Sequence, residues 1–410
     1  MAAKKKTSKK KATTKRKTAA KAPAGRKRAS KARSLADEKA RVADLREVAL
    51  TSIHKVAEDV YGKAREGRLP TLTMPQRNLQ NVEYDKESGV FRMKGNLKVR
   101  TLDVNSVRTF AQTLRLMSLA KEMVADDDFA TKREAYYVSK NWADCKFDEQ
   151  RESDTVLDDI EAMFSMEGVT RETLRFVPEE HGGSVVGPLT VIDRDPETDE
   201  EIRSDCSAMG SGAYTIPSSV DHLRFETTAK YVLAIETGGM FQRLNHHRYW
   251  RNHHCILVEM GGVPTRATRR FVRRLADDLG LPVYAFVDCD PYGICNIYRT
   301  LKVGSGLAAH VNKEFSVPTA RFLGVTPQDI VDFQLEDATH PLQAVDVKRA
   351  KDALKNDPFF RSHPKWKKAL KQMLEMGVRA EQQAFAKWGL NFVIEEYLPR
   401  KIAGKKNFLP

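Results

Sequence analysis

The sequence predicts a multidomain α/β protein whose central domain contains a parallel β-sheet. Three apolar runs, at residues 231–235, 255–258 and 283–287, have the length of buried strands, and the segments between them have helical periodicity. Short buried strands that alternate with helices are typical of parallel α/β sheets. The length of 410 residues indicates two or three domains, and a hydrophobic content of 41% allows a sizeable core.

The first 34 residues differ in composition from the rest of the chain. They hold 15 of the 69 Lys and Arg residues and no acid, whereas the remaining 54 basic residues face 55 acidic ones. We predict that residues 1–34 form a disordered tail that binds DNA phosphates nonspecifically. A localisation signal or a solubilising tail is the alternative interpretation. The charge of the folded body gives no separate evidence of nucleic-acid binding.

Several classes of protein are disfavoured by composition. No apolar run reaches the length of a membrane span, and no signal peptide is visible, so we expect no membrane association. The five scattered cysteines contain no Cys-x-x-Cys pair, which favours a reducing compartment and argues against structural zinc. The histidine pairs 246–247 and 253–254 lack a matching cysteine or carboxylate pattern, so zinc is not expected there.

Residues 35–70 are predicted to form a helix with one apolar stripe. Apolar residues recur at three- and four-residue spacing from Val42 to Val60, and Gly67 and Pro70 follow the pattern. The stripe can pack either on its own domain or on a partner subunit, and the sequence does not decide between them.

Residues 71–165 combine a predicted β-hairpin with three helices. Alternation at 82–84, a turn at 88–89 and an apolar return at 90–93 predict the hairpin. Helices are expected from about Ser106, from a capping box at 131–134 and from near Ser153. Val107, Phe110, Leu114 and Met117 are expected on the inner face of the first. This combination is compatible with a winged-helix DNA-binding module.

The helix that begins at residue 131 carries a candidate nucleophile. Arg133 and Tyr137 are four residues apart, so they share one helix face. A guanidinium beside a phenol can hold a phosphate oxygen while the phenolate attacks. A packed tyrosine pair next to a surface arginine is the simpler interpretation of this segment alone.

The second half of the chain divides into three parts. Residues 166–228, rich in Gly, Pro and acidic turns, are predicted to connect the domains through short strands; residues 229–345 form the α/β domain, and 346–410 are a helical extension. In the helix at 268–279, Arg269, Arg270, Arg273 and Arg274 are expected on a solvated face, with DNA contact as the alternative. Trp366, Leu370, Met373, Trp388 and Leu390 are core candidates of the extension.

Acidic residues follow two of the predicted strands. Glu236 ends the first run, and Asp288 and Asp290 follow the third, where strand alternation would place both on one side. Function in parallel sheets collects at the carboxyl ends of strands. Three carboxylates brought together repel one another, and Mg²⁺ is the natural cation to neutralise them. The alternative is that both aspartates are capping or turn residues before Pro291-Tyr-Gly293.

These motifs resemble those of a known family. Glu236 with Asp288-Cys-Asp-Pro-Tyr-Gly293 resembles a Toprim domain, the metal-binding fold of topoisomerases and bacterial primases. The chain as a whole, over about residues 35–400, resembles the A subunits of type IIB DNA topoisomerases, the family that includes Spo11. The segments that carry the resemblance are 131–137, 232–236, 240–244, 268–270, 281–293, 304–305 and 322–327.

The resemblance implies a mechanism and a set of partners. Tyr137 would be the nucleophile in a winged-helix domain at 71–165, Arg133 would assist it, and Glu236, Asp288 and Asp290 of a Toprim domain at 229–345 would hold Mg²⁺. Double-stranded DNA would be cleaved and religated through a 5′-phosphotyrosyl bond. The chain would form a homodimer in which one protomer's tyrosine meets the other's metal site.

The resemblance also implies a B subunit, which would bind and hydrolyse ATP and dock on the helix at 35–70, giving an A2B2 heterotetramer. The protein would act in the cytoplasm on the nucleoid, or in the nucleus of a eukaryote. Two alternatives are a Spo11-like protein that breaks DNA without strand passage and a non-catalytic architectural DNA-binding protein.

Overall fold

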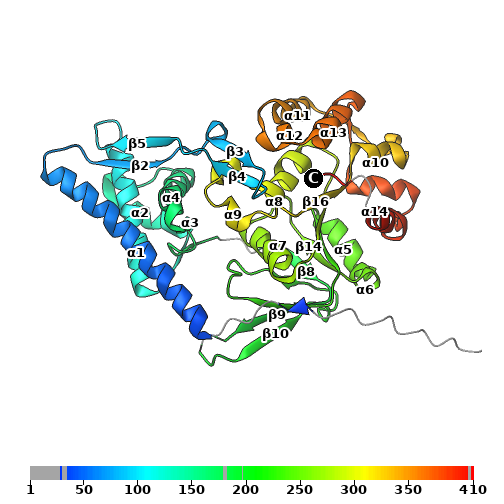
Figure 1. Cartoon of the computed structure of the whole chain (residues 1–410), viewed down its shortest axis with the longest axis horizontal. Coiled ribbons are helices and arrows are strands. Elements are labelled where there is room, and N and C mark those ends of the chain that lie inside the picture. Colours follow the sequence, from blue (N-terminus) through cyan, green and yellow to red (C-terminus); the bar gives the residue numbers. More distant parts are fainter. Residues whose placement is uncertain (1–27, 30–34, 179–181, 196, 405–407) are drawn as a thin grey trace, which may run out of the picture.

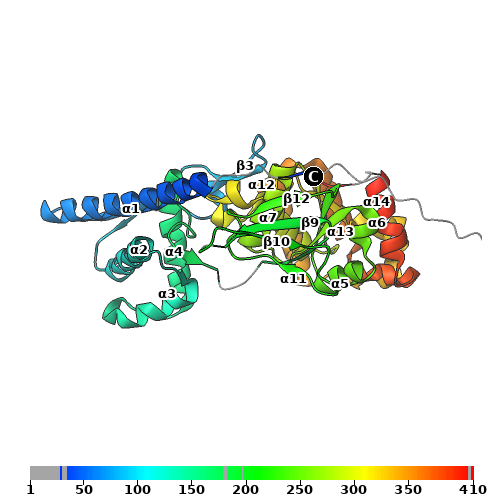
Figure 2. The same cartoon turned by 90° about the horizontal axis from the view of Figure 1, so that it is seen from below.

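The protein folds around two separate hydrophobic cores, which define a helical lobe and an α/β lobe (Figures 1 and 2). The structure is a computed structural model, and it describes residues 28–29, 35–178, 182–195, 197–404 and 408–410. Most of the predicted basic tail therefore lies outside the described residues. Its described part, β1 (Arg28–Ala29), is a two-residue strand that pairs with β12 (Arg224–Thr227), so this short piece is ordered.

The described part of the helical lobe contains four α-helices, an antiparallel strand pair and a short parallel pair. The elements are α1 (Leu35–Arg65), β2 (Thr71–Pro75), β5 (Leu97–Thr101), α2 (Val107–Asp126), β6 (Ala130–Thr131), α3 (Lys132–Val138), α4 (Gln150–Phe164) and β7 (Phe176–Val177). The core of this lobe is formed by apolar residues from the four helices and from β2, β6 and β7, among them Phe110, Leu157 and Phe164. The predicted helices are thus present, although Val107 lies outside the core with half of its surface exposed.

Helix α1 packs its apolar stripe on its own lobe. Ala49 and Ile53 are buried in the helical core, and α1 contacts both α2 and β2. The opposite face is exposed, as Thr51 and Glu58 show. In both views α1 runs along the outer edge of the lobe (Figures 1 and 2). The apolar stripe therefore packs on its own domain, one of the two possibilities left open by the sequence. The other face of α1 is exposed to solvent.

The predicted hairpin joins the other lobe. Strands β3 (Val82–Asp85) and β4 (Val90–Met93) pair antiparallel as expected. Their buried residues Val82 and Phe91, however, belong to the α/β core, whereas β2 and β5 on either side belong to the helical lobe. Residues 71–101 therefore link the two lobes, because one stretch of chain contributes to both cores.

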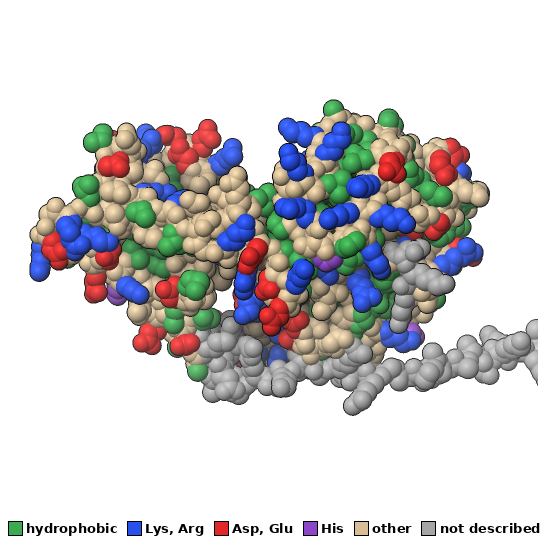
Figure 3. All heavy atoms as spheres, turned by 45° about the horizontal axis from the view of Figure 1, so that its top comes forward, with side chains coloured by type: hydrophobic (Ala, Val, Ile, Leu, Met, Phe, Trp, Pro, Cys, Tyr) green, Lys and Arg blue, Asp and Glu red, His purple; other side chains and the backbone are tan. Residues whose placement is uncertain are grey.

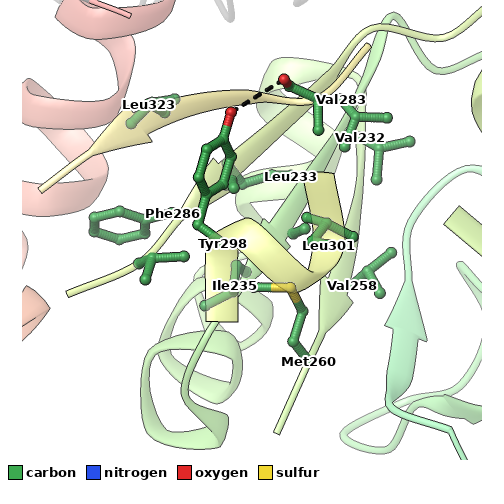
Figure 4. Close-up of a cluster of buried hydrophobic side chains, with 14 of the residues drawn as sticks. Val232, Leu233, Ile235, Val258, Met260, Val283, Phe286, Tyr298, Leu301 and Leu323 are labelled. Carbon is green, nitrogen blue, oxygen red and sulfur yellow. Dashed lines mark hydrogen bonds between the residues drawn. The ribbon is translucent and has the colours of Figure 1, made fainter. Parts of the chain in front are cut away.

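The α/β lobe is built on a six-stranded sheet of order β11-β8-β14-β13-β15-β16. The last four strands are parallel, and β8 and β11 add an antiparallel edge from the region predicted to be a connection. The strands are β8 (Ser184–Val186), β11 (Tyr214–Thr215), β13 (Tyr231–Ile235), β14 (Cys255–Glu259), β15 (Val283–Phe286) and β16 (Arg321–Gly324). Figure 4 shows Val232, Leu233, Val283 and Leu323 of three neighbouring strands packed around Tyr298, whose hydroxyl donates to the Ala320 carbonyl.

The remaining elements surround this sheet. A four-stranded sheet combines β1 and β12 with β9 (Leu189–Arg194) and β10 (Glu201–Asp205). The helices that follow the parallel strands are α5 (Gly238–His246), α6 (Tyr249–His253), α7 (Arg266–Leu279), α8 (Arg299–Val303), α9 (Asn312–Phe315) and α10 (Pro327–Asp332). The C-terminal extension contains α11 (Ala344–Asn356), α12 (Pro358–Ser362), α13 (Pro364–Met376) and α14 (Leu398–Gly404), with β17 (His340–Pro341) pairing with β18 (Val378–Arg379).

Two predictions about side-chain placement are wrong. The arginines of α7 do not form a solvated face: Arg269 is buried, Arg270 pairs with Asp221, and Arg273 and Arg274 donate to backbone carbonyls. In the extension, Trp366, Leu370 and Met373 are buried as predicted, but Trp388 is 47% and Leu390 66% exposed. Both lie in a region of short helical turns, where helical periodicity does not identify the inner face.

A buried ion pair also joins the lobes. Glu161 of α4 is fully buried and accepts hydrogen bonds from Arg266 of α7 at 2.6 and 2.7 Å and from the Arg171 amide at 2.8 Å. His310 contacts the same carboxylate at 3.2 Å. Although burial alone would raise it, Arg266 and His310 hold the pKa of Glu161 well below its usual value. The junction between the lobes is thus both apolar and charged.

We expect Phe91→Ala to destabilise the whole chain rather than the hairpin alone. Removing a fully buried ring from the α/β core costs about 3–5 kcal/mol in free energy of unfolding. Urea unfolding followed by tryptophan fluorescence measures this, because Trp142 and Trp366 report from different lobes. Val99→Ala on exposed β5 is the control and should change stability by about 0.5 kcal/mol or less. A loss below about 1 kcal/mol for Phe91→Ala would contradict a linking role.

Candidate active site

The parallel sheet brings the predicted acidic residues to one edge. Strand β13 lies between β14 and β15, with Ile235 in register with Phe286. The amide of Glu236 donates to the Phe286 carbonyl at 3.0 Å, so Glu236 follows β13 at the height where β15 ends. Carboxylates from two strands therefore meet at the carboxyl edge, as the sequence predicted.

The two aspartates reach this edge in a way the sequence did not predict. Strand β15 ends at Phe286, so Asp288 and Asp290 follow the strand and alternation along it does not place them. Instead, the Asp288 amide donates to Glu236 Oε2 at 2.8 Å, which fixes the loop after β15 to the end of β13. Asp290 accepts a hydrogen bond from the Gly293 amide, as the turn interpretation predicted. The structural and the functional interpretations of Asp290 are thus compatible.

Gln382 is a site residue that the sequence analysis missed. Its backbone amide donates to Asp288 Oδ1 at 2.9 Å. Its side-chain amide donates to the Phe286 carbonyl at 2.7 Å and accepts a hydrogen bond from the Thr237 hydroxyl. The residue is fully buried. It lies 94 residues beyond Asp288 in a segment without recognisable pattern, so no signal in the sequence could have identified it.

The carboxylates destabilise one another electrostatically. Burial, followed by the charge of Asp288, raises the pKa of Glu236 to about 8. Burial, together with the charges of Asp290 and Glu381, raises the pKa of Asp288 to about 7. Burial likewise raises the pKa of Asp290, with a further contribution from Asp346. A bound cation would relieve this accumulation of negative charge.

The acidic residues have the ligand chemistry that a divalent cation requires, but their side chains are not arranged as a complete coordination site. In the described part of the chain, no set of three or more His, Cys, Asp or Glu side chains is close enough to bind a metal ion directly. Glu236 and Asp288 each use one oxygen for a backbone amide, which leaves the other oxygen for a ligand. Mg²⁺ suits such a site because it binds through one or two carboxylates and keeps several waters.

Tyr136 and Tyr137 of α3 have different surroundings. Tyr137 is 56% exposed, and its hydroxyl forms no hydrogen bond to a residue that the structure describes. The Arg133 guanidinium carbon lies 6.0 Å from the centre of its ring, as the four-residue spacing predicted. Tyr136, by contrast, donates to the Asp148 carbonyl at 3.0 Å and packs under the Lys140 ammonium group. Only Tyr137 of the pair presents a free hydroxyl to an incoming substrate.

Within one chain the structure does not bring Tyr137 to the acidic residues. Helix α3 belongs to the helical lobe, and Glu236 lies two residues before the start of α5 in the α/β lobe. Both views place α3 and α5 apart along the long axis of the molecule (Figures 1 and 2). The predicted site residues therefore form two separate groups, Arg133 with Tyr137 and Glu236 with Asp288 and Asp290.

Comparisons with known proteins place this geometry in a family. A model of the Toprim domain shared by Spo11 and the topoisomerase 6 A subunit matches residues 231–402. The chain is 54% identical over 365 residues to the A subunit of type 2 DNA topoisomerase 6 from Methanocaldococcus jannaschii, covering 89% of this chain and 97% of that protein. The chain belongs to the family of type IIB DNA topoisomerase A subunits. Thus α5 and the strand edges described above are parts of a Toprim domain.

Further relatives and family models agree with this membership. The corresponding topoisomerase 6 A subunits of Methanothermobacter thermautotrophicus and Halobacterium salinarum are 37% and 36% identical, over 88% and 85% of this chain and 99% and 94% of theirs. A type IIB DNA topoisomerase model matches residues 108–175, and a model of the all-beta domain of the topoisomerase VI alpha subunit matches 179–229. The latter region contains β9, β10 and β12. None of the helices in the described ranges is long and apolar enough to cross a membrane.

We expect Glu236→Gln to stabilise the protein in the absence of divalent cations. A carboxyl whose pKa is raised by folding costs stability at every pH above its unfolded-state pKa, and glutamine removes that cost. The free energy of unfolding in EDTA at pH 8 should rise by about 0.5–2 kcal/mol.

Thermal unfolding of both proteins, with and without added MgCl2, measures the effect. The wild type should gain stability from Mg²⁺ and the variant should gain much less. Glu58→Gln on exposed α1 is the matched control and should behave as the wild type. Equal gains in Glu236→Gln and wild type would show that Glu236 holds no cation.

Proposed function

We propose that the protein cleaves and religates double-stranded DNA as the A subunit of a type IIB topoisomerase, with Tyr137 as nucleophile and Glu236, Asp288 and Asp290 as Mg²⁺ ligands. The observation that carries this proposal is the presence in one chain of a solvent-exposed tyrosine beside Arg133 and, in the other lobe, of a buried carboxylate cluster with raised pKa values. Membership of the family supports it.

The chemistry assigns a role to each residue. The Tyr137 oxygen attacks a backbone phosphorus, the bond between phosphorus and the 3′ oxygen breaks, and a 5′-phosphotyrosyl bond remains. The proton lost by the phenol is balanced by the one that the leaving 3′ oxygen takes up. Arg133 stabilises charge on the phosphoryl oxygens. Glu236, Asp288 and Asp290 would hold Mg²⁺, which would supply positive charge to neutralise the phosphate and stabilise the leaving oxygen. Because one ester replaces another, resealing needs no ATP.

The helical lobe is proposed to bind the duplex as a winged-helix module. Helices α2, α3 and α4 with the β2–β5 pair supply the helices and antiparallel ribbon that such a module requires. Arg133 and Tyr137 lie on its exposed surface. The protein would therefore work on the nucleoid in the cytoplasm, or in the nucleus if its source is eukaryotic.

Two partners complete the proposed enzyme. The separation of α3 from the acidic cluster within one chain supports a homodimer in which each tyrosine serves the metal site of the other protomer. An ATP-hydrolysing B subunit would drive strand passage and form an A2B2 heterotetramer. The exposed face of α1 is the proposed docking surface, because the opposite face is already buried on α2 and β2.

Tyr137→Phe should abolish both covalent DNA attachment and DNA relaxation. The assay combines supercoiled DNA, a cognate B subunit, ATP and Mg²⁺, and traps covalent complexes with detergent. Tyr136→Phe is the matched control and should retain attachment, since the Tyr136 hydroxyl is engaged by Asp148. Attachment by Tyr137→Phe at the wild-type level would exclude Tyr137 as the nucleophile.

Mixing two inactive variants tests the proposed exchange between protomers. A dimer of one Tyr137→Phe chain and one Glu236→Gln chain would contain one complete site, built from the intact tyrosine of one protomer and the intact carboxylate of its partner. We expect the mixture, after exchange of protomers, to nick one strand of the duplex, whereas each variant alone leaves DNA intact. If both residues acted within one chain, the mixture would remain inactive.

A further inference from the structure

A face of the α/β lobe carries an accumulation of exposed basic residues that the proposed chemistry does not use. It lies on helices α11, α12 and α13, which pack against one another, and Figure 3 shows basic side chains gathered over this part of the lobe. We call it the lysine face. Its exposed members are Lys348, Lys351, Lys355, Arg361, Lys365, Lys367, Lys368 and Lys371.

Acidic residues compensate the charge of the lysine face only in part, because Asp352 and Glu375 are the only exposed acids on the fully described helices α11–α13. None of its eight cations forms an ion pair or side-chain hydrogen bond with a residue in the described ranges. Residues 344–376 contain nine Lys or Arg against four Asp or Glu. Of those acids, Asp346 and Asp357 are buried and face Arg349, Arg379 and Arg299 instead. The arrangement differs from that of α7, whose arginines are all buried, ion-paired or bonded to carbonyls.

The spacing of the cations suits a long polyanion. Lys348, Lys351 and Lys355 recur at three- and four-residue spacing, so they lie along one side of α11. A helix of 13 residues is about 20 Å long, and duplex DNA carries one negative charge per ~1.7 Å. Lys365 and Lys368 repeat the pattern on α13. Several phosphates of one duplex could therefore contact this face together.

The lysine face lacks the features of a protein-binding surface. Interfaces between proteins are anchored by aromatic and aliphatic side chains at their centre. Among the large apolar residues of α11–α13, only Val345 is exposed. Nucleic-acid backbones, by contrast, bind through charge and counterion release without apolar anchors. The chemistry therefore favours phosphates over an acidic protein.

The face adjoins the acidic cluster. Asp346 lies in the first turn of α11, and α11 contacts the helical turn at residues 293–298 that directly follows the acidic loop. Three residues further along α11, the Arg349 guanidinium carbon lies 5.2 Å from the centre of the Tyr292 ring, and Tyr292 is two residues from Asp290. A duplex with a phosphate at the acidic cluster can therefore continue along the neighbouring helices.

We propose that the lysine face binds the sugar-phosphate backbone of the duplex DNA arm that leaves the cleavage site. The inference rests on the proposed function, because the acidic cluster fixes where the duplex lies. The face reads no base sequence, since it offers only flexible ammonium groups and one guanidinium. It extends the DNA-contacting surface beyond the residues that perform the chemistry.

The test compares the triple variant Lys351→Gln, Lys355→Gln, Lys368→Gln with a matched control, Lys94→Gln, Lys230→Gln, Lys313→Gln, whose lysines lie outside the proposed winged-helix module. All six lysines are exposed, and the control lysines lie outside α11–α13. Affinity of the full chain for a duplex of about 40 base pairs, ~140 Å long, is measured across a series of salt concentrations without Mg²⁺. The slope of log affinity against log salt should fall by about 2–3 in the first variant, at about 0.9 per phosphate contact.

Further arms decide the interpretation. Arginine at the same three positions should restore the slope, because charge rather than shape is required. A salt slope for duplex DNA equal to that of the control would overturn the proposal. So would a loss of affinity by the triple variant that appears only with duplex RNA or only with a B subunit. Covalent trapping by the parent protein is scored separately with Mg²⁺. Absence of trapped complexes would refute the proposed catalysis, whereas an unchanged salt slope would refute the lysine face alone.

Discussion

The central constraint on the site is the hydrogen-bonded position of β13 between two parallel neighbours. This arrangement sets the end of β13 beside the end of β15, and the amide of Asp288 then donates to Glu236. Burial and the charge of neighbouring carboxylates make the ionised forms of Glu236 and Asp288 unfavourable, as their raised pKa values show. The sheet maintains the cluster because its strands are buried on both faces, so the carboxylates cannot separate without disturbing the core.

The sequence identified the features that depend on local pattern. Apolar runs of strand length, the helix start at Thr131 and the two arms of the hairpin all appear where the pattern placed them. Glu236 was singled out because it follows an apolar run, whereas Tyr137 was singled out through the family resemblance, since its spacing from Arg133 alone favoured a packed tyrosine pair. Such features are encoded within a few residues, so they can be recognised without knowledge of the tertiary structure.

Features that depend on distant contacts were not predictable. Gln382 reaches Asp288 across 94 residues, and nothing around it distinguishes it from other polar residues. The arginines of α7 seemed solvated because their partners, such as Asp221, lie far away in sequence. The exposure of Trp388 shows the opposite error, since residue type alone favoured burial. Each error arose where tertiary packing overrides the preference of a single residue.

The hairpin β3–β4 has a mechanical consequence. Its strands leave the helical lobe, insert Val82 and Phe91 into the neighbouring core and return, while Glu161 and Arg266 bind across the same boundary. Separating the two lobes of one chain would expose these apolar side chains, at a cost of about 1.5–3 kcal/mol each. It would also leave the buried carboxylate of Glu161 without its partner. Each chain should therefore move as one rigid unit. In the proposed homodimer, a gap wide enough for a second duplex would have to open between the two chains rather than between the lobes of one chain.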